Sequence, residues 1–340
     1  MDKFIRVRSH VARLLDLSLF QFDPDLTFAV FFLNADRTIY GRYGSRSDFI
    51  EAERDISLQG LAKAMQGALD VHAGYPANRS SLAGKSGSKP PFATLMESGF
   101  VKRQPRSIGH CGHCHHLQTA RQDALRRAGR PFPDDVVYPW PMPETIGLVL
   151  DSREKATVRR VAKDSAAQRA GFRSGDMISH LDGQPVLSIA DVQWVLHSAK
   201  GPSTIEVEIT REAKRVSLSL RLDEGWRQRS DISWRVTTGN LRRYALGRMR
   251  LEELGAEDRR RVGLGDDEMA LRVKNLRSES PAGRAGFRRG DVIVEFDGQS
   301  KRASESQLLA IGVQNHKHGD RIDVTVLRDG ARKTLTLPLE

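Results

Sequence analysis

The sequence predicts an α+β, multidomain chain, in which a partial α/β region precedes two small β-barrel modules with capping helices. The chain has 340 residues, enough for two or three domains with separate cores. A segment of 21 residues occurs twice, 115 residues apart, with 13 identical positions. The residues before this repeat combine a predicted β-hairpin with an amphipathic helix, which indicates a separate α/β region at the start.

The first predicted region covers residues 1–75. Its segment LTFAVFFLNADRTIYGRYGSR predicts two strands around a turn at Ala35–Arg37. The following segment, SLQGLAKAMQGALDVH, predicts a helix with Ser57 as its N-cap. Ahead of both, FIRVR predicts a strand and Val11–Phe20 a helix.

This order of strand, helix, hairpin and helix resembles the C-terminal half of a thioredoxin-like fold. The resemblance is carried by FDPDLTFAVFFLNADRTIYGRYG. It implies that Met1 is not the native start, and that an upstream part supplies a signal peptide and the missing strands. The protein would then be periplasmic, whereas a native start at Met1 would place it in the cytoplasm.

Residues 76–142 are predicted to be a linker that carries a helix. The linker is rich in Gly, Ser, Lys and Pro as far as Ser107, and then holds both cysteines of the chain in GHCGHCHH. The next residues, CHHLQTARQDALRRAGR, predict a helix that stops at Gly129. The proline-rich PFPDDVVYPWPMPE is expected to be extended.

The cysteine spacing satisfies the C-x-x-C-H pattern of c-type haem attachment. Cys111 and Cys114 would form the thioethers, and His115 would be the axial iron ligand. A sixth ligand would come from Met142, His110 or His116.

Other interpretations of this segment stay open. Two thiolates and several imidazoles also suit a transition metal, Zn²⁺ or copper. A Cys-Gly-His-Cys dithiol at a helix start would have a lowered thiol pKa, with His113 assisting. Structural or inert cysteines are the remaining alternative.

The repeat defines two predicted modules, at residues 143–223 and 261–340. Each copy has a short helical turn ending at a glycine, a Gly-Asp turn, an apolar strand and an Asp-Gly turn. A helix and two alternating strands complete each module. Residues 224–260 are predicted to be a linker with a short helix near 250–261, packed on a module by Trp226 and Trp234.

The segments SAAQRAGFRSGDMI…DG and SPAGRAGFRRGDVI…DG resemble the bacterial form of the PDZ domain. The resemblance implies that an extended peptide, above all a carboxyl terminus, adds a strand to a sheet edge beside a carboxylate-binding loop. In the first copy the implied groove is formed by the TIGL loop, the strand after it and one helix face: Thr145, Ile146, Gly147, Leu148, Val149, Ile189, Val192 and Leu196. In the second copy the implied loop contains Val262, Gly263 and Leu264, although Asp266, Asp267 and Glu268 stand where the groove strand is expected.

The charge pattern, the hydropathy and the absence of a protease motif exclude several classes of function. The net charge is +11, from 54 Lys and Arg against 43 Asp and Glu, but basic and acidic residues alternate, as in RLEELGAEDRRR, so no nucleic-acid partner is expected. No apolar stretch is long enough to span a membrane. The sequence also lacks a Gly-x-Ser-Gly-Gly protease motif. We therefore expect a non-enzymatic, exported adaptor that binds protein ends or extended peptides; the alternative is a thiol-disulfide or haem-linked redox protein that selects clients through its modules.

Overall fold

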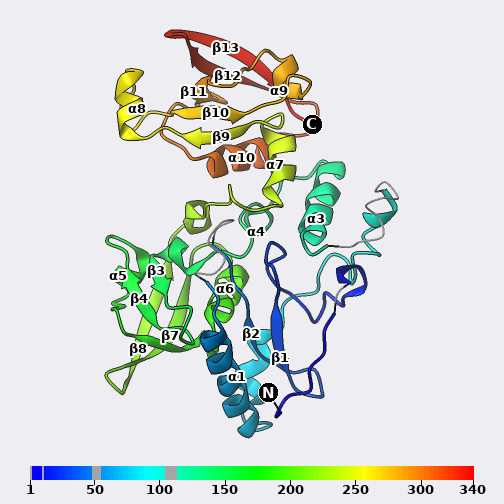
Figure 1. Ribbon diagram of the computed structural model, residues 1–340, viewed down its shortest axis with the longest axis vertical. Coiled ribbons are helices and arrows are strands. Elements are labelled where there is room, and N and C mark those ends of the chain that lie inside the picture. Colours follow the sequence, from blue (N-terminus) through cyan, green and yellow to red (C-terminus); the bar gives the residue numbers. More distant parts are fainter. Residues whose placement is uncertain (1, 10, 48–54, 104–112) are drawn as a thin grey trace. The chain divides into compact units, whose positions relative to one another are not determined.

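A computed structural model describes residues 2–9, 11–47, 55–103 and 113–340 (Figure 1). It divides into two compact units, and each is described by itself. One unit comprises residues 1–120 and 139–230, and the other comprises residues 121–138 and 231–340. No helix in the described ranges combines the length and apolar character that a membrane crossing requires.

The N-terminal region is α/β. Strands β1 (Val30–Leu33) and β2 (Ile39–Tyr43) form an antiparallel hairpin, and helix α1 (Leu58–Ala73) follows, so both predicted elements are confirmed. The Ser57 side chain accepts a hydrogen bond from the Gly60 amide and caps α1 as predicted. Short 3₁₀ helices complete the region: η1 (Ala12–Leu14), η3 (Arg79–Lys85) and η4 (Val101–Arg103).

Two predictions for the start of the chain were wrong. FIRVR forms no strand, and Ile5 and Val7 are 96% and 91% exposed, because no neighbouring strand covers them in the described chain. The predicted helix at 11–20 is only the turn η1, since the Asp16 carboxylate accepts the Ser18 amide and competes with helical bonding. Of the four elements that resemble half a thioredoxin-like fold, only the hairpin and the last helix form.

The first module contains two antiparallel sheets. Strands β3 and β4 pair with each other, and a second sheet has the order β6-β5-β7-β8. Helix α6 carries the predicted groove face, and η6 follows the module. The elements are η5 (Pro143–Ile146), β3 (Leu148–Leu150), β4 (Val158–Val161), α5 (Ala166–Arg169), β5 (Met177–Leu181), β6 (Gln184–Pro185), α6 (Ile189–Ser198), β7 (Ser203–Arg211), β8 (Lys214–Leu222) and η6 (Trp226–Arg229).

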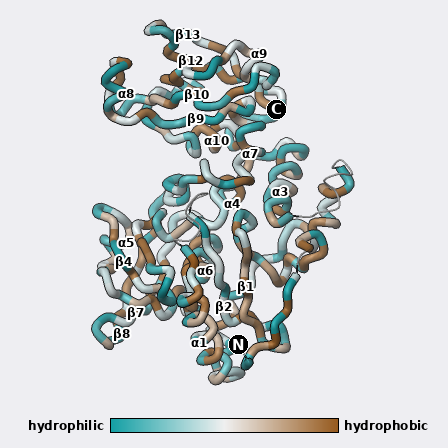
Figure 2. Tube along the Cα trace, viewed as in Figure 1, coloured by the Kyte–Doolittle hydropathy of each residue, from teal (hydrophilic) through white to brown (hydrophobic). Residues whose placement is uncertain are grey.

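The second module forms one antiparallel sheet in the order β13-β12-β11-β10-β9. The alternating hydropathy of its last hairpin can be followed in Figure 2. Helices α3 (His115–Arg127), α4 (Asp134–Val137) and α7 (Thr238–Ala245) precede it. Its own elements are β9 (Arg250–Glu253), α8 (Ala256–Arg261), β10 (Leu271–Asn275), α9 (Pro281–Arg284), β11 (Val292–Phe296), α10 (Glu305–Gln314), β12 (Arg321–Arg328) and β13 (Ala331–Pro338).

The repeated Gly-Asp turn has the same structural role in both modules. The buried Asp176 carboxylate accepts two hydrogen bonds, each 2.7 Å long, from Arg211 at the end of β7. Arg328 binds Asp291 in the same bidentate way at 2.6 and 2.7 Å. Each arginine also donates to the carbonyl of the glycine that ends the preceding helical turn. The Gly-Asp turn therefore recurs in both copies because its aspartate binds an arginine of the hairpin and holds the hairpin to the turn.

A second buried ion pair joins the N-terminal region to α6 within the same unit. Lys85 Nζ lies 2.7 Å from Asp191 Oδ1, and the two side chains are 1% and 0% exposed. The amides of Arg42 and Leu187 donate to the same carboxylate. The Arg42 guanidinium lies 3.9 Å from the ring centroid of Trp194 on α6. The face of α6 that points away from the module's core is thus covered by the N-terminal region.

We predict that Asp191→Ala lowers the free energy of unfolding by about 3–5 kcal/mol, because it leaves the Lys85 ammonium buried without its carboxylate. Urea denaturation at pH 7 measures the loss. Glu154→Gln is the matched control, since it removes an ion pair to Lys63 in which both side chains are 39% exposed, and it should cost no more than about 1 kcal/mol. Equal losses in the two variants would contradict this account of the buried pair.

Candidate peptide-binding site

The predicted carboxylate loop of the first module is a tight turn. Helix η5 begins with Pro143 and is capped by Gly147, whose φ of 89° lies in the left-handed region. A Cβ on Gly147 would lie 2.2 Å from Cβ of Ser165, the N-cap of α5. The close neighbour of this glycine, which the PDZ resemblance places in the groove, is thus the module's own helix cap.

Strand β3 has one free edge in the described chain. The Ala162 amide donates to the Gly147 carbonyl, and the Asp151 amide donates to the Thr157 carbonyl, both on the β4 side. Because backbone groups alternate along an antiparallel pair, those of Leu148 and Leu150 point away from β4. No second strand pairs with β3 among the described residues. This edge is where the PDZ resemblance places an added strand.

Helix α6 brings the predicted wall residues beside this strand. Ile189, Val192 and Leu196 are buried and share one apolar core with Leu148 and the loop residue Ile146. Thr145 and Val149 are half-buried. The structure therefore gathers all eight predicted residues of the first groove into one module.

The C-terminal end of α6 is also fixed. The Arg227 guanidinium donates to the carbonyls of Leu196, His197 and Ala199 at 3.1, 2.5 and 2.8 Å. These are the carbonyls that a helix end leaves without partners, and a cation is favourable there. Trp226, predicted to pack on a module, lies buried in the first module's core.

Helix α1 limits the far end of the β3 edge. The Ser57 hydroxyl donates to the Ser152 carbonyl at 2.9 Å, and a Cβ on Gly60 would lie 2.1 Å from that oxygen. Ser152 continues the alternation of Leu148 and Leu150, so its carbonyl belongs to the same outward edge. The part of the edge without a hydrogen-bonding partner in the described chain therefore runs from Leu148 to Leu150.

Charged groups of both signs surround the loop. Glu144 reaches solvent, yet the protein packed around its carboxyl raises its pKa to about 7, and the charge of Asp55 adds to the shift. Arg159 and Arg160 are exposed on β4, and their charges partly oppose this shift. Sequence reasoning missed Glu144, although its position in the loop was visible.

In the second module the predicted loop residues lie elsewhere. Val262, Gly263 and Leu264 follow α8 in the connection between β9 and β10. The strand that pairs with β10 in the manner of β3 with β4 is β9: Leu251 faces Val273, as Leu150 faces Val158. Sequence reasoning missed β9 because RLEE is mostly charged. The signal that could have found it is the preceding LGRM, a counterpart of TIGL.

The Cys-His segment lies at the start of α3. Cys111 and His110 fall outside the described residues, so the spacing that suggested a haem cannot be followed as geometry. Cys114 is a free thiol, and burial raises its pKa. The rings of His113 and His115 stack with centroids 5.4 Å apart, and His116 lies against both. In the described ranges, no three His, Cys, Asp or Glu side chains are placed to hold a metal ion.

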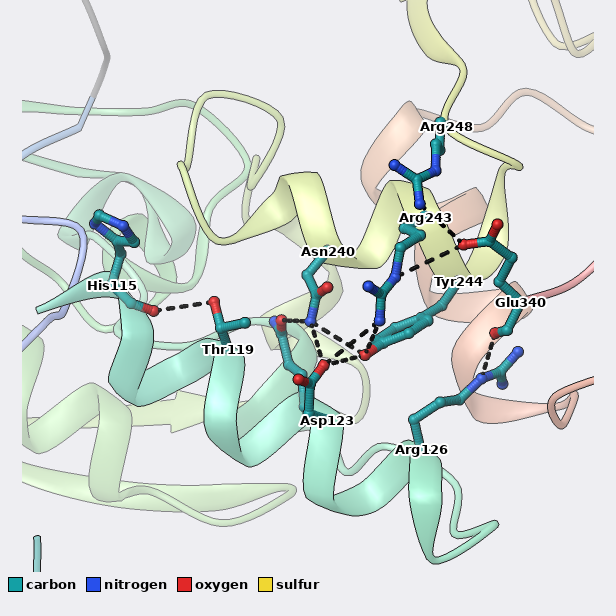
Figure 3. Close-up of polar contacts among 10 residues, drawn as sticks. His115, Thr119, Asp123, Arg126, Asn240, Arg243, Tyr244, Arg248 and Glu340 are labelled. Atoms are coloured by element: carbon teal, nitrogen blue, oxygen red, sulfur yellow. Dashed lines mark hydrogen bonds and ion pairs between the residues drawn. The ribbon is translucent and has the colours of Figure 1, made fainter. Parts of the chain in front are cut away.

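The apolar residues that follow the motif in sequence pack in the cores of the two modules. Among the apolar residues near the motif in sequence, Phe132, Val136, Val137 and Tyr138 lie in the core of the second module. Trp140 and Met142 pack in the core of the first module. Figure 3 shows that α3 itself continues from His115 to Asp123 and Arg126, which bind Tyr244 and Glu340 in the second unit. The apolar residues Leu117 and Ala120 of α3 pack with Leu17, Leu95 and Phe100. We derive no reaction step through a haem.

Comparisons with known proteins support the modules. The PDZ domain family model matches residues 145–222 and 250–339. The chain is 29% identical over 201 residues to a probable periplasmic serine endoprotease DegP-like from Pseudomonas savastanoi pv. phaseolicola, covering 58% of this chain and 39% of the relative. It is 24% identical over 176 residues to the periplasmic serine endoprotease DegP of Escherichia coli (strain K12), covering 49% and 33%.

The chain therefore spans about two fifths of the length of the first of these curated relatives, and a third of the second. Among solved structures, the HtrA-type protease AlgW with tripeptide matches 27% of this chain and 29% of its own, with 30% identity and a TM-score of 0.24. The curated relatives are periplasmic proteases by name, and the described homology concerns their PDZ-bearing part. The chain carries two PDZ domains, and its relation to the HtrA and DegP proteases is distant.

Proposed function

We propose that this chain is a non-enzymatic, exported adaptor that binds the carboxyl ends of other proteins at its first module. One observation carries the proposal: the outward edge of β3 from Leu148 to Leu150 has no strand partner in the described chain, and both leucines share one apolar core with residues of α6. A peptide that adds there would form main-chain hydrogen bonds with Leu148 and Leu150.

The short edge supports a chain end over an internal segment. Ser57 and Gly60 lie against the Ser152 carbonyl, so an added strand meets α1 soon after Leu150. An internal segment would have to continue past the loop at one end and past α1 at the other. A free carboxylate instead stops at the loop, where Arg159 and Arg160 supply positive charge. Export is supported by the periplasmic names of the curated relatives.

We predict that peptides selected from a display library of random C-terminal heptapeptides slow hydrogen exchange at the Leu148 and Leu150 amides of the full chain. Added main-chain hydrogen bonds protect those two amides, whereas the Leu181 amide in β5 is an internal control. NMR measures the exchange, with the same peptides carrying a C-terminal amide as the matched ligand control. A library that yields no binder, or binders that leave β3 unprotected, would overturn the proposal.

The loop carboxyl predicts a pH dependence. Glu144 has a raised pKa of about 7, so it is mostly neutral at pH 6 and mostly ionised at pH 8. The ionised form repels the carboxylate of a bound peptide, and the affinity of a selected His-free peptide should fall by about two- to tenfold over this range. Titration calorimetry at both pH values measures the change. Glu144→Gln should bind equally at both, and an unchanged pH slope in that variant would count against this role.

The redox alternative makes a different demand on the Cys-His segment. A dithiol oxidoreductase needs an activated thiolate, but burial raises the pKa of Cys114. In a Cys111→Ser variant we predict that iodoacetamide alkylates Cys114 slowly at pH 7 and that the rate keeps rising beyond pH 9. A rate that levels off below pH 7 would favour the redox function instead.

The haem or metal expected at Cys111, Cys114 and His115 remains a prediction. A pyridine haemochrome spectrum and metal analysis of protein expressed in a periplasm are its direct tests.

A further inference from the structure

The two modules differ at the first residue of the helix that faces the groove strand. Helices α6 and α10 both begin after a serine N-cap, Ser188 and Ser304. The next residue is Ile189 in the first module and Glu305 in the second. These positions are equivalent, because each immediately follows the cap of the corresponding helix.

Glu305 makes a contact that an isoleucine cannot make. Its Oε1 accepts a hydrogen bond of 2.7 Å from the Leu251 amide in β9. Its Oε2 lies 2.5 Å from Nη2 of Arg242, and the Arg242 Nε donates to Oε1 at 3.0 Å. The Glu305 side chain is 5% exposed. The carboxylate is therefore buried and bonded to both the groove strand and helix α7.

The Leu251 amide, which donates its hydrogen bond to Glu305, lies on the outward edge of β9. The Leu254 amide donates to the Ala270 carbonyl on the β10 side, so Leu251, three residues earlier, points the other way. Leu251 faces Val273 in the same way that Leu150 faces Val158. Val158 and Val273 are 115 residues apart, which is the offset of the repeat. Leu251 is thus the counterpart of Leu150, whose amide also points outward.

Helix α7 holds this arrangement in place. Arg242 donates to the Ser233 carbonyl as well as to Glu305, so its guanidinium is fixed from two sides. A Cβ on Gly312 of α10 would lie 2.4 Å from Cβ of Ala245, which shows how closely α7 and α10 approach. The carboxylate, the arginine and the strand amide form one buried contact between α10, α7 and β9.

We propose that the residue at this helix start decides which module can add a strand: Ile189 leaves the Leu150 amide available, and Glu305 closes the second module by taking the Leu251 amide. The expected effects on peptide binding rest on the proposed function of the first module. The second module is then a folded PDZ domain that does not accept chain ends at β9. The full chain should bind one peptide, not two.

The test exchanges the two residues in the full chain and uses the display-selected peptide as the probe. Ile189→Glu should weaken binding by about tenfold or more, because a carboxylate would compete for the Leu150 amide and repel the peptide. Glu305→Ile combined with Arg242→Met should raise the calorimetric stoichiometry from one peptide to two; the second change avoids a buried unpaired guanidinium. Glu305→Gln keeps an acceptor for Leu251 and should leave one peptide bound. Thermal unfolding of every variant checks that it is folded.

A ligand-free measurement keeps this inference separate from the proposed function. In the unmodified chain, hydrogen exchange at the Leu251 amide should be slower than at Leu150, and Glu305→Ile with Arg242→Met should accelerate it at Leu251. If the library yields no binder, the proposed function fails while this comparison still decides whether Glu305 closes β9. Equal exchange at the two amides, two peptides bound by the unmodified chain, or binding unaffected by Ile189→Glu would each overturn the inference.

Discussion

The Asp191 carboxylate fixes helix α6 in the first unit, and the geometry of the candidate site depends on that helix. Asp191 binds the Lys85 ammonium and two backbone amides while it is completely buried. A buried charge tolerates few arrangements, since every alternative leaves it without a partner and without water. Because Arg227 holds the other end of α6, the wall opposite β3 is set at both ends.

The N-terminal region consequently belongs to the site as well as to the fold. Its β2 supplies the Arg42 amide to Asp191, and its α1 places Ser57 against the Ser152 carbonyl. One contact positions the helix wall, and the other limits the length of the strand edge. The same region therefore supports the groove and restricts what it can accept. A PDZ module without this region would have a longer free edge on β3.

Sequence patterns predicted the repeated elements well and the contacts between elements poorly. Strands such as Met177–Leu181 and Val292–Phe296 are short, mostly apolar segments between glycine-containing turns, so their limits followed from local chemistry. Strand β9 was missed because its charged residues hide a strand whose single buried apolar side chain is Leu251. FIRVR was assigned a strand on propensity alone, but a strand needs a neighbour. The role of Glu305 could not be predicted, since it depends on Leu251 and Arg242, 54 and 63 residues away.

The divergence of the modules follows from what the repeat preserves. The Asp176–Arg211 and Asp291–Arg328 ion pairs hold a hairpin to a turn in both copies. The groove makes no comparable demand on the fold, so its residues are free to differ between copies. In the first copy an isoleucine at the helix start adds apolar surface to the core and leaves the strand edge open. In the second, a glutamate requires Arg242 to neutralise it, and α7 brings that arginine into place. The contact that occupies the Leu251 amide thus involves a helix outside the repeat.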